Sequence, residues 1–354
     1  MWTRLGATLC WSLIVWTVLP QPRSEAQDRE SMDWLDEAYQ AIARDEYKEA
    51  VVRLTKAKSA ARKAKDRAVL LEIENTKKWV TVLRRKWQEL RSAREQLESD
   101  GNDAAANAKI GRFYCFAKSD WTRGAAFLAR GNDSQLRELG RMELAKPSQS
   151  AARLNLATSW LEAATSSRDA KEKRAMQLRA RHWLLMAGGT TNDSRAKRAI
   201  NRELEHIVLR PTRIVIWNTH NAPHGDRGTL ECTLTLLNQG KTVTAGKLRL
   251  PWSNEKNLAH VALLPGKEVD EVRIDITRWP RNGGGLAEVL VFEERTNLAA
   301  GCEVHSSGAF SARFGSEKLN DGITGAREER YATGYWLLPS KTKGWCSINL
   351  TKVK

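Results

Sequence analysis

The residue pattern of this chain changes near residue 211, and this change limits the folds that the chain can adopt. From Ser31 to about Arg210 the sequence is rich in Ala, Leu, Arg, Lys and Glu and contains a single proline, Pro147, which is a helical composition. After Arg210, short runs of Ile, Val, Thr and Leu are separated by Gly, Pro, Asn and Asp, as in antiparallel sheets. The length of 354 residues is enough for two domains. We therefore expect a multidomain α and β protein, with an α-helical region over 27–210 and an antiparallel β-sandwich over 211–354.

The first 26 residues have the pattern of a secretory signal peptide. Arg4 precedes an apolar stretch from Leu5 to Leu19, and Ser24-Glu25-Ala26 provides small residues for cleavage after Ala26. The apolar stretch is about 15 residues long, shorter than the roughly 20 residues that span a bilayer, and an uncleaved anchor is the alternative. We expect a secreted or periplasmic protein whose mature chain has no transmembrane span. The cysteines of that mature chain are Cys115, Cys232, Cys302 and Cys346, and their pairing is left open.

One stretch of the helical region predicts a long helix between Asp66 and Glu98. Its face is marked by positions that step by three and four along the chain. These positions are Ile73, Thr76, Val80, Leu83, Trp87, Leu90, Arg94 and Leu97. Runs of Gly, Asn, Asp and Ser within residues 99–103, 131–134 and 188–193 predict helix ends followed by new N-caps. The region should therefore fold as helical hairpins.

A weak internal repeat also favours helical hairpins. Residues 45–54 align with residues 119–128: in each copy an acidic residue opens a helix, an aromatic residue follows, and a small residue comes three positions later. The pattern loosely resembles tetratricopeptide-like repeats, in which paired helices pack side by side. A strict period of about 34 residues is not visible, so a generic helical bundle is the alternative.

The chain is basic, with 58 Lys and Arg against 42 Asp and Glu and a formal net charge of +16. Most of the excess lies in the helical region. One cluster there could bind phosphate, sulfate or uronate groups, although an ordinary solvated helix face is the favoured interpretation. The cluster consists of Lys56, Lys58, Arg62, Lys63, Lys65 and Arg67. Because the chain has an export signal and no known nucleic-acid motif, we expect no specific nucleic-acid partner.

The sandwich region contains seven predicted strands separated by turns. Several alternate cleanly, as in Arg273–Thr277, where the isoleucines would face inward and the polar side chains outward. The predicted strands are Arg213–Asn218, Thr229–Leu237, Thr242–Leu250, Ala259–Leu264, Glu271–Thr277, Ala287–Glu293 and Gly344–Leu350.

Several of these segments resemble a discoidin domain, also called the coagulation factor five/eight C-terminal type. Asn297-Leu298-Ala299, Leu319-Asn320-Asp321-Gly322 and Gly344–Leu350 resemble its opening half. Arg213–Asn218, Val272–Ile276 and Gly285–Phe292 resemble its closing half. The resemblance implies a galactose-binding-like jelly roll. The closing half (211–295) here precedes the opening half (296–354), which inverts the order of the family.

The inverted order indicates a circular permutation, in which new termini open at Lys354 and Pro211 while residues 293–297 join the old ends. The alternative is a tandem of two incomplete domains, each completed by another chain. The permutation predicts that the strand ending at Leu350 pairs or packs beside the one that begins near Arg213. It also predicts that the new termini lie close together.

The sequence favours binding over catalysis. No His-Glu-x-x-His or Gly-x-Ser-x-Gly motif occurs, and Gly240-Lys241-Thr242 lacks the upstream glycine of a phosphate-binding loop. We therefore expect no enzymatic activity. The discoidin resemblance implies instead a module that binds carbohydrate or a cell-surface glycan, with a structural calcium held by Asp321 and Glu288. A turn cap at Asp321 and a solvent-facing Glu288 are the alternative.

Ligand-binding residues are expected on the loops of the sandwich, where planar donors and aromatic rings can meet hydroxyl groups and sugar faces. The candidates are His220, Asn221, Arg227, Arg330 and Tyr331. Our main hypothesis is an exported, non-enzymatic protein that binds carbohydrate through the sandwich. The alternative is a scaffold whose helices bind another protein, with the sandwich as a structural module.

Overall fold

The structure is a computed structural model, which describes residues 25–221, 224–255, 257–324 and 334–354. Its first part is helical and its second consists of antiparallel sheets, as the change of pattern near residue 211 predicts. The helices are α1 (Glu25–Ala43), α2 (Tyr47–Lys63), α3 (Arg67–Glu89), α4 (Arg91–Ser99), α5 (Ala104–Arg112), the π-helix η1 (Phe113–Ala117), α6 (Trp121–Leu128), α7 (Ser134–Leu144), α8 (Ser150–Ser166), α9 (Ala170–Gly188) and α10 (Ser194–Glu205).

Aspartate side chains begin several helices at the predicted N-caps. Asp103 accepts a hydrogen bond from a backbone N–H in the first turn of α5, Asp133 does so in α7, and Asp193 does so in α10. Each carboxylate satisfies a backbone amide that has no partner within its own helix. The helix ends predicted within residues 99–103, 131–134 and 188–193 are therefore confirmed.

The long helix predicted between Asp66 and Glu98 is divided at Leu90. α3 ends at Glu89 and α4 begins at Arg91, because Leu90 has a ψ of 9°, outside the helical range. The Arg94 guanidinium donates to the Trp87 carbonyl, with 3.4 Å between Nη2 and O, and stacks on the Trp87 ring. The single-helix prediction is wrong at its C-terminal end, where this local contact replaces the regular helical path.

The two copies of the internal repeat share one local geometry. Asp45 and Ser119 have positive φ angles of 64° and 61°. Two residues later, an aromatic residue begins a helix in each copy, Tyr47 in α2 and Trp121 in α6. The alignment therefore identifies a repeated turn whose common element is a residue in the left-handed conformation.

The sandwich consists of two sheets whose described strand pairs are antiparallel. One sheet has the order β4-β1-β6-β7, with β9 also paired to β6, and the other has the order β3-β2-β5-β10-β8. The strands are β1 (Arg213–Asn218), β2 (Glu231–Asn238), β3 (Lys241–Arg249), β4 (Ala259–Leu263), β5 (Glu271–Arg278), β6 (Gly285–Glu293), β7 (Thr296–Asn297), β8 (Cys302–Ser306), β9 (Trp336–Leu337) and β10 (Gly344–Val353).

The seven predicted strands correspond to β1–β6 and β10. The alternation that predicts β5 is confirmed, because Val272, Ile274 and Ile276 are buried while the residues between them are partly exposed. β7 and β9 have two residues each, too few to show a period of two. β8 was not predicted either; its central positions are partly or fully exposed, so an apolar alternation does not mark it.

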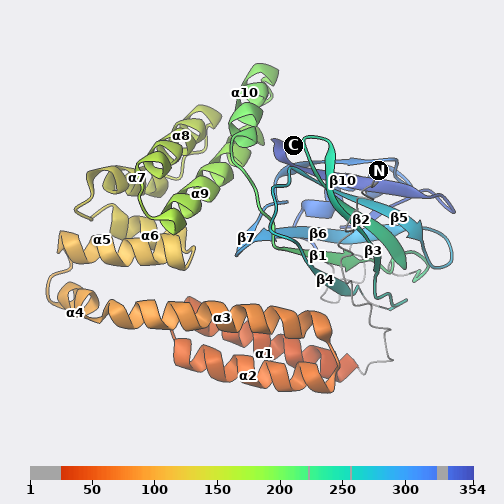
Figure 1. Ribbon diagram of the computed structural model, residues 1–354, viewed down its shortest axis with the longest axis horizontal. Helices are drawn as coiled ribbons and strands as arrows, with labels where there is room; N and C mark the ends of the chain where they lie inside the picture. The colour runs from red at the N-terminus through yellow and green to blue at the C-terminus, as the bar shows by residue number, and fades with distance from the viewer. Residues whose placement is uncertain (1–24, 222–223, 256, 325–333) are drawn as a thin grey trace, which may run out of the picture.

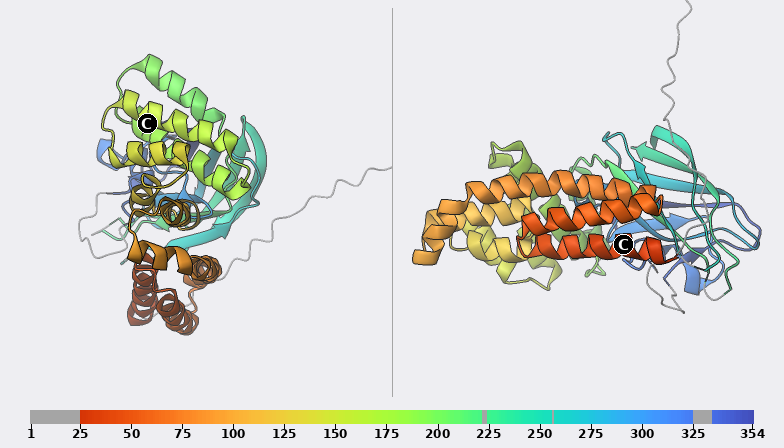
Figure 2. Two further views of the ribbon diagram at one scale, coloured as in Figure 1. Left: turned by 90° about the vertical axis from the view of Figure 1, so that its left-hand side faces the viewer. Right: turned by 90° about the horizontal axis from the view of Figure 1, so that it is seen from below.

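The helices form an arc that meets the sandwich at both ends (Figure 1). α1, α2 and α3 lie side by side, and α3 contacts β4. Seen from below, these three helices run as parallel rods toward the sandwich (Figure 2). At the other end of the arc, α10 packs on β10.

The circular permutation predicts that β1 and β10 are neighbours. They lie in different sheets and do not pair, but both contribute residues to one hydrophobic core. Val269 N–H donates to the Leu209 carbonyl over 3.0 Å, and Leu350 N–H donates to the Asp270 carbonyl over 2.7 Å. The chain that enters the sandwich and the end of β10 thus contact adjacent residues. The circular permutation, with the closeness of Lys354 and Pro211 that it implies, stays a prediction.

The hydrophobic core does not divide where the secondary structure changes. One cluster of buried residues joins α1, α2, α3 and α5, and includes Leu54, Ile73 and Leu83. The other cluster joins the later helices with both sheets, and includes Leu184 and Ile214. Residue 211 therefore marks a change of secondary structure, whereas by packing α6–α10 belong with the sandwich.

In the described part of the chain, no helix is both long and apolar enough to cross a membrane. Cys115, Cys232, Cys302 and Cys346 are all buried and unpaired. Burial raises the pKa of each thiol, so these side chains behave as small apolar core residues.

Candidate functional site

Three of the predicted ligand-binding residues lie at one end of the sandwich. His220, Asn221 and Arg227 follow β1 in a single loop. The loops after β3, after β5 and before β10 contact this loop through hydrogen bonds. We call this region the loop end. Arg330 and Tyr331, the other two predicted residues, lie outside the described residues.

The His220 ring links two loops of the loop end. Its Nδ1 lies 2.8 Å from Oδ1 of Asn257, which also accepts the His220 backbone N–H over 3.1 Å. Asn257 Nδ2 in turn donates to the Thr324 carbonyl over 3.0 Å. Asn257, in the loop after β3, therefore joins the loop that contains His220 to the segment just beyond the Asp321 turn.

Asn221 shapes the turn in which it lies. Its φ of 59° is left-handed, and its Nδ2 donates to Asp226 Oδ1 over 2.5 Å. The second Asp226 oxygen accepts from Asn282 Nδ2 over 2.7 Å. Burial raises the pKa of Asp226, but the hydrogen bonds from Asn221 and Asn282 outweigh it, so the pKa is lowered overall. Asp226 is thus an ionised, half-buried acceptor at the loop end.

Arg227 is buried, and its guanidinium bonds to the protein itself. Nη1 donates to the Leu338 carbonyl over 2.8 Å, and Nη2 donates to Ser340 Oγ over 2.7 Å. The guanidinium also lies 4.3 Å from the centre of the Phe310 ring. Arg227 therefore supports an aromatic side chain that reaches the surface.

Sequence reasoning missed the aromatic cluster that Arg227 supports. Phe310 is 50% exposed. Phe314 lies 6.2 Å from Phe310 and stacks on Tyr335, with 5.3 Å between ring centres and 13° between ring planes. We call Phe310, Phe314 and Tyr335 the aromatic platform. The available signal was the pair of phenylalanines four residues apart in a segment rich in Ser and Gly, where no core strand is predicted.

The two predicted metal ligands approach each other beside the loop end. The Gly322 N–H donates to Glu288 Oε1 over 3.3 Å, which places the Asn320–Gly322 turn against β6. Glu288 is 1% exposed, and its other oxygen has no hydrogen-bond partner. Burial, and then the nearby Asp321 carboxylate, raise the pKa of Glu288 to about 8. The Oδ1 of buried Asn320 also lacks a partner.

This donor set fits a hard cation, because carboxylate and amide oxygens are the ligands that calcium prefers. A cation would compensate the repulsion between Glu288 and Asp321 and would partner the two orphaned oxygens. Among the described residues, no three His, Cys, Asp or Glu side chains come together as a metal cluster. A calcium ion here would therefore need the Asn320 amide, backbone carbonyls or water in addition to the two carboxylates.

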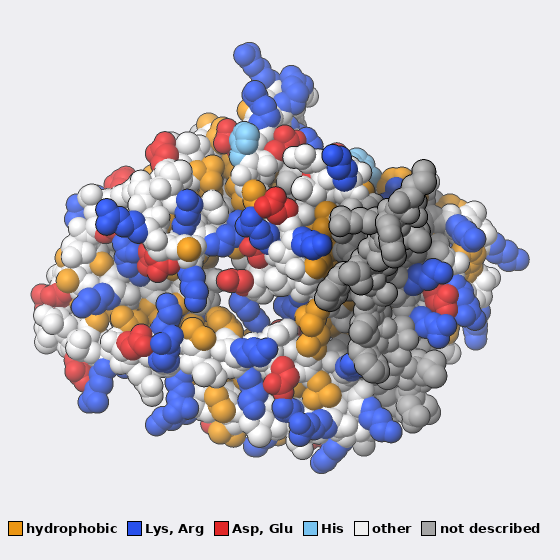
Figure 3. All heavy atoms as spheres, in the orientation of Figure 1, with side chains coloured by type: hydrophobic (Ala, Val, Ile, Leu, Met, Phe, Trp, Pro, Cys, Tyr) orange, Lys and Arg blue, Asp and Glu red, His pale blue; other side chains and the backbone are white. Residues whose placement is uncertain are grey.

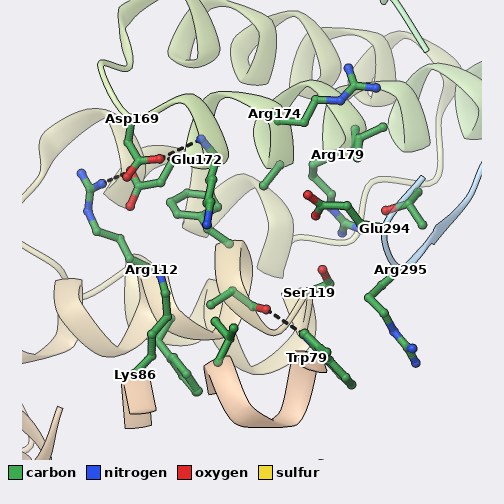
Figure 4. A pocket seen from close by; sticks show the side chains of 18 of the residues that line it. Trp79, Lys86, Arg112, Ser119, Asp169, Glu172, Arg174, Arg179, Glu294 and Arg295 are labelled. Atoms are coloured by element: carbon green, nitrogen blue, oxygen red, sulfur yellow. Dashed lines mark hydrogen bonds and ion pairs between the residues drawn. The ribbon is translucent and has the colours of Figure 1, made fainter. Parts of the chain in front are cut away.

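A second candidate site is a cavity of about 830 Å³ between the helices and the sandwich. Figure 3 shows this face hollowed between the two parts, with lysine and arginine side chains around the hollow. In Figure 4, Trp79 and Lys86 of α3 lie on one side, Arg174 and Arg179 of α9 on the other, and Arg295 reaches in from the turn between β6 and β7. No sequence pattern predicts this cavity, because the residues of its walls are far apart along the chain.

Basic side chains dominate the cavity wall, with nine Lys and Arg against four Asp and Glu. The arginines are fixed by carboxylates. Arg112 pairs with Asp133 and Glu172, Arg174 with Glu293, Arg179 with Glu143, and Arg213 and Arg295 with Glu72. These ion pairs hold the frame of the cavity in place.

Comparisons of the chain with protein-family models, with curated proteins and with solved structures found no match.

Proposed function

We propose that this chain is an exported, non-enzymatic binding protein that recognises a carbohydrate or a cell-surface glycan at the loop end of its sandwich. The aromatic platform is the observation that carries the proposal. Phe310 offers a half-exposed ring, Phe314 lies beside it and is partly exposed, and the buried Tyr335 stacks against Phe314 from the core side. A flat ring covers the C–H face of a sugar, and a rigid aromatic side chain loses little conformational entropy on binding.

Polar groups that match sugar hydroxyls lie in the same loop cluster. The Asp226 carboxylate is ionised and half-buried, and Asn282 and His220 are partly or fully exposed. Their hydrogen bonds to Asn221 and Asn257 fix these groups before a ligand arrives, which lowers the entropic cost of binding. Arg227 acts beneath the platform, as the support of Phe310.

A structural calcium completes the proposed domain. Glu288 and Asp321 would hold it, with the Asn320 amide oxygen as a further donor. When bound, the ion would lock the Asn320–Gly322 turn against β6. Because Asn257 bonds to Thr324 just beyond that turn, the ion would also steady the loop that holds His220. The discoidin resemblance and the circular permutation belong to the same proposal.

Screening the mature chain, residues 27–354, on a glycan array and measuring the bound glycans by calorimetry tests the proposal. Replacing Phe310 by Ala should weaken glycan binding by roughly 3- to 10-fold, because one stacking contact is lost. Leu144→Ala is the matched control, because Leu144 at the end of α7 is 46% exposed and far along the chain from the loop end. Absence of glycan binding with or without calcium, or equal loss in both variants, would refute the sugar-binding proposal.

A further inference from the structure

We propose that the cavity between the helices and the sandwich is a second binding site, which takes an acidic oligosaccharide carrying uronate or sulfate groups. It uses none of the loop-end residues, and it rests on the proposed function only in taking the ligand to be a carbohydrate. Three features of the cavity support an acidic oligosaccharide: its lysines, the aromatic and polar side chains between them, and its volume.

The free cations are lysines. Lys78, Lys86, Lys109 and Lys171 line the cavity, and none has an ion pair with a described carboxylate. The arginines of the same wall are held by carboxylates, as described above. An anionic ligand would therefore meet four ammonium groups that have no ion pair, within a frame of paired arginines.

Lysines of both walls lie close enough to Asp169 to act on its charge. Asp169 precedes α9, and its pKa is lowered, first by the backbone N–H groups of Glu172 and Lys171 and then by the charges of Lys86 and Lys171. Lys86 belongs to α3 and Lys171 to α9, so both walls bring positive charge to one place. A ligand with acidic groups along its length would bridge the walls, whereas a single small anion would meet only some of the lysines.

The surfaces between the lysines suit sugar rings. Trp79, Phe116 and Trp121 line the cavity and are partly exposed there, so they can cover C–H faces. Asn75 and Ser119 add an amide and a hydroxyl that can meet sugar hydroxyls. The volume of about 830 Å³ lies within the range of pockets that enclose a ligand of several rings.

Calorimetry of the full mature chain with matched oligosaccharides tests this inference. The probes are a heparin-derived hexasaccharide, which carries sulfate and uronate groups, a galacturonic acid hexamer, which carries uronate alone, and neutral maltohexaose. We expect at least one acidic probe to bind, to bind more weakly at high salt, and to exceed maltohexaose by 10-fold or more. The two acidic probes separate sulfate from uronate recognition.

The deciding variant replaces Lys78, Lys86, Lys109 and Lys171 together by Gln. Its control removes the same charge outside the cavity, by replacing the exposed Lys48, Arg198, Arg202 and Lys267 by Gln. We expect the cavity variant to lose 20-fold or more in affinity for the acidic probe and the control to lose less than 3-fold, with both melting as the parent does. Phe310→Ala should bind the acidic probe as the parent does, which separates this site from the loop end.

Four outcomes would overturn the inference. These are no binding of either acidic probe, equal binding of maltohexaose, equal losses in the two charge variants, and tighter binding of poly-glutamate than of the acidic sugars. The last result would identify an acidic peptide as the ligand. If the cavity variant melts at a lower temperature than the parent, Lys78→Gln and Lys171→Gln as single variants should each weaken binding by about 3-fold.

Discussion

The helices contact the sandwich at two places, and the two contacts consist of different kinds of interaction. At α9 and α10, Arg181 is buried and donates to the carbonyls of Leu298 and Leu350 over 2.5 and 2.7 Å. Gly188 lies so close to Val353 that a Cβ there would come within 2.6 Å of its side chain. We call this the Arg181 contact. It is continuous with the main hydrophobic core.

At α3, the contact rests on one acidic side chain. Glu72 pairs with Arg213 of β1 and with Arg295 beyond β6, and it accepts a hydrogen bond from Tyr39 over 2.6 Å. Arg295 stacks on Trp79, which lines the cavity. We call this the Glu72 contact. The helices α1–α3 have a hydrophobic core of their own, so they can separate from the sandwich without breaking the core that contains the sheets.

The difference between the Arg181 contact and the Glu72 contact explains how one chain can form a cavity between its helices and its sandwich. The Arg181 contact is a permanent joint, because opening it would expose core residues and leave buried carbonyls without donors. The Glu72 contact consists of ion pairs whose side chains are between 9% and 27% exposed, and opening it would return these charged groups to water without breaking the main core.

The largest expected effect comes from Arg181→Ala. The change leaves the Leu298 and Leu350 carbonyls with only the weak Cys302 thiol as a donor and removes a buried side chain, so we expect a loss of about 3–5 kcal/mol in the free energy of unfolding. Urea denaturation followed by tryptophan fluorescence measures it. Arg202→Ala, at an exposed position of α10, is the control and should change the value by less than about 0.5 kcal/mol. A loss below 1 kcal/mol for Arg181→Ala would show that the joint is not permanent.

The second-largest effect is a pH dependence of the stability, which originates at Glu288 in the sandwich and not at either contact. Glu288 has a pKa of about 8 in the folded protein, above the value of about 4.3 for an unfolded glutamate. Between these values the folded state binds more protons than the unfolded state, so its stability falls as the pH rises. From pH 5 to pH 8.5 we expect a loss of about 2–4 kcal/mol, which Glu288→Gln should remove.

Calcium should reverse that pH effect, because a bound cation favours the ionised form of Glu288 and lowers its pKa. Thermal melting of the parent with and without calcium at pH 8.5 measures this, and the Glu288→Gln variant provides the comparison. A parent whose melting temperature does not respond to calcium would remove the ion from the proposed function. A stability that does not fall with pH would contradict the raised pKa.

The smallest expected effect is that of Glu72→Gln, which tests the weaker contact. Arg213 and Arg295 lose their charged partner, and we expect a cost of about 1–2 kcal/mol. Hydrogen exchange should rise in α3 and β4 and stay unchanged in α9 and β10. Glu74→Gln is the control, because Glu74 pairs with Lys58 of α2 instead of the sandwich. Faster exchange in β10 would show that the two contacts are coupled.

The sequence predicts local structure well because local patterns carry it. The alternation in Arg273–Thr277 predicts β5, and Asp103 predicts the start of α5 through one capping bond. The sequence does not distinguish Arg181 from the other arginines of its helix, because its acceptors lie more than 100 residues away. The sequence also does not reveal that α6–α10 share a hydrophobic core with the sandwich, because that packing joins residues that are far apart along the chain.

The candidate sites follow the same division. The loop that holds His220, Asn221 and Arg227 was identified from its residue types, because planar polar side chains cluster there in the sequence. The role of Arg227 beneath Phe310 depends on two loops that fold together, so no local sequence pattern predicts this role. The cavity lysines come from α3, α5 and α9, and only the arc of helices brings them to one place.

Hydrogen exchange of the full mature chain, with and without the glycan that binds best on the array, tests the central claim most directly. If the loop end binds the glycan, residues 307–314 and 334–343 should exchange more slowly in its presence, and Phe310→Ala should abolish that protection at the same glycan concentration. Protection confined to the helices, with none at residues 307–314, would contradict it.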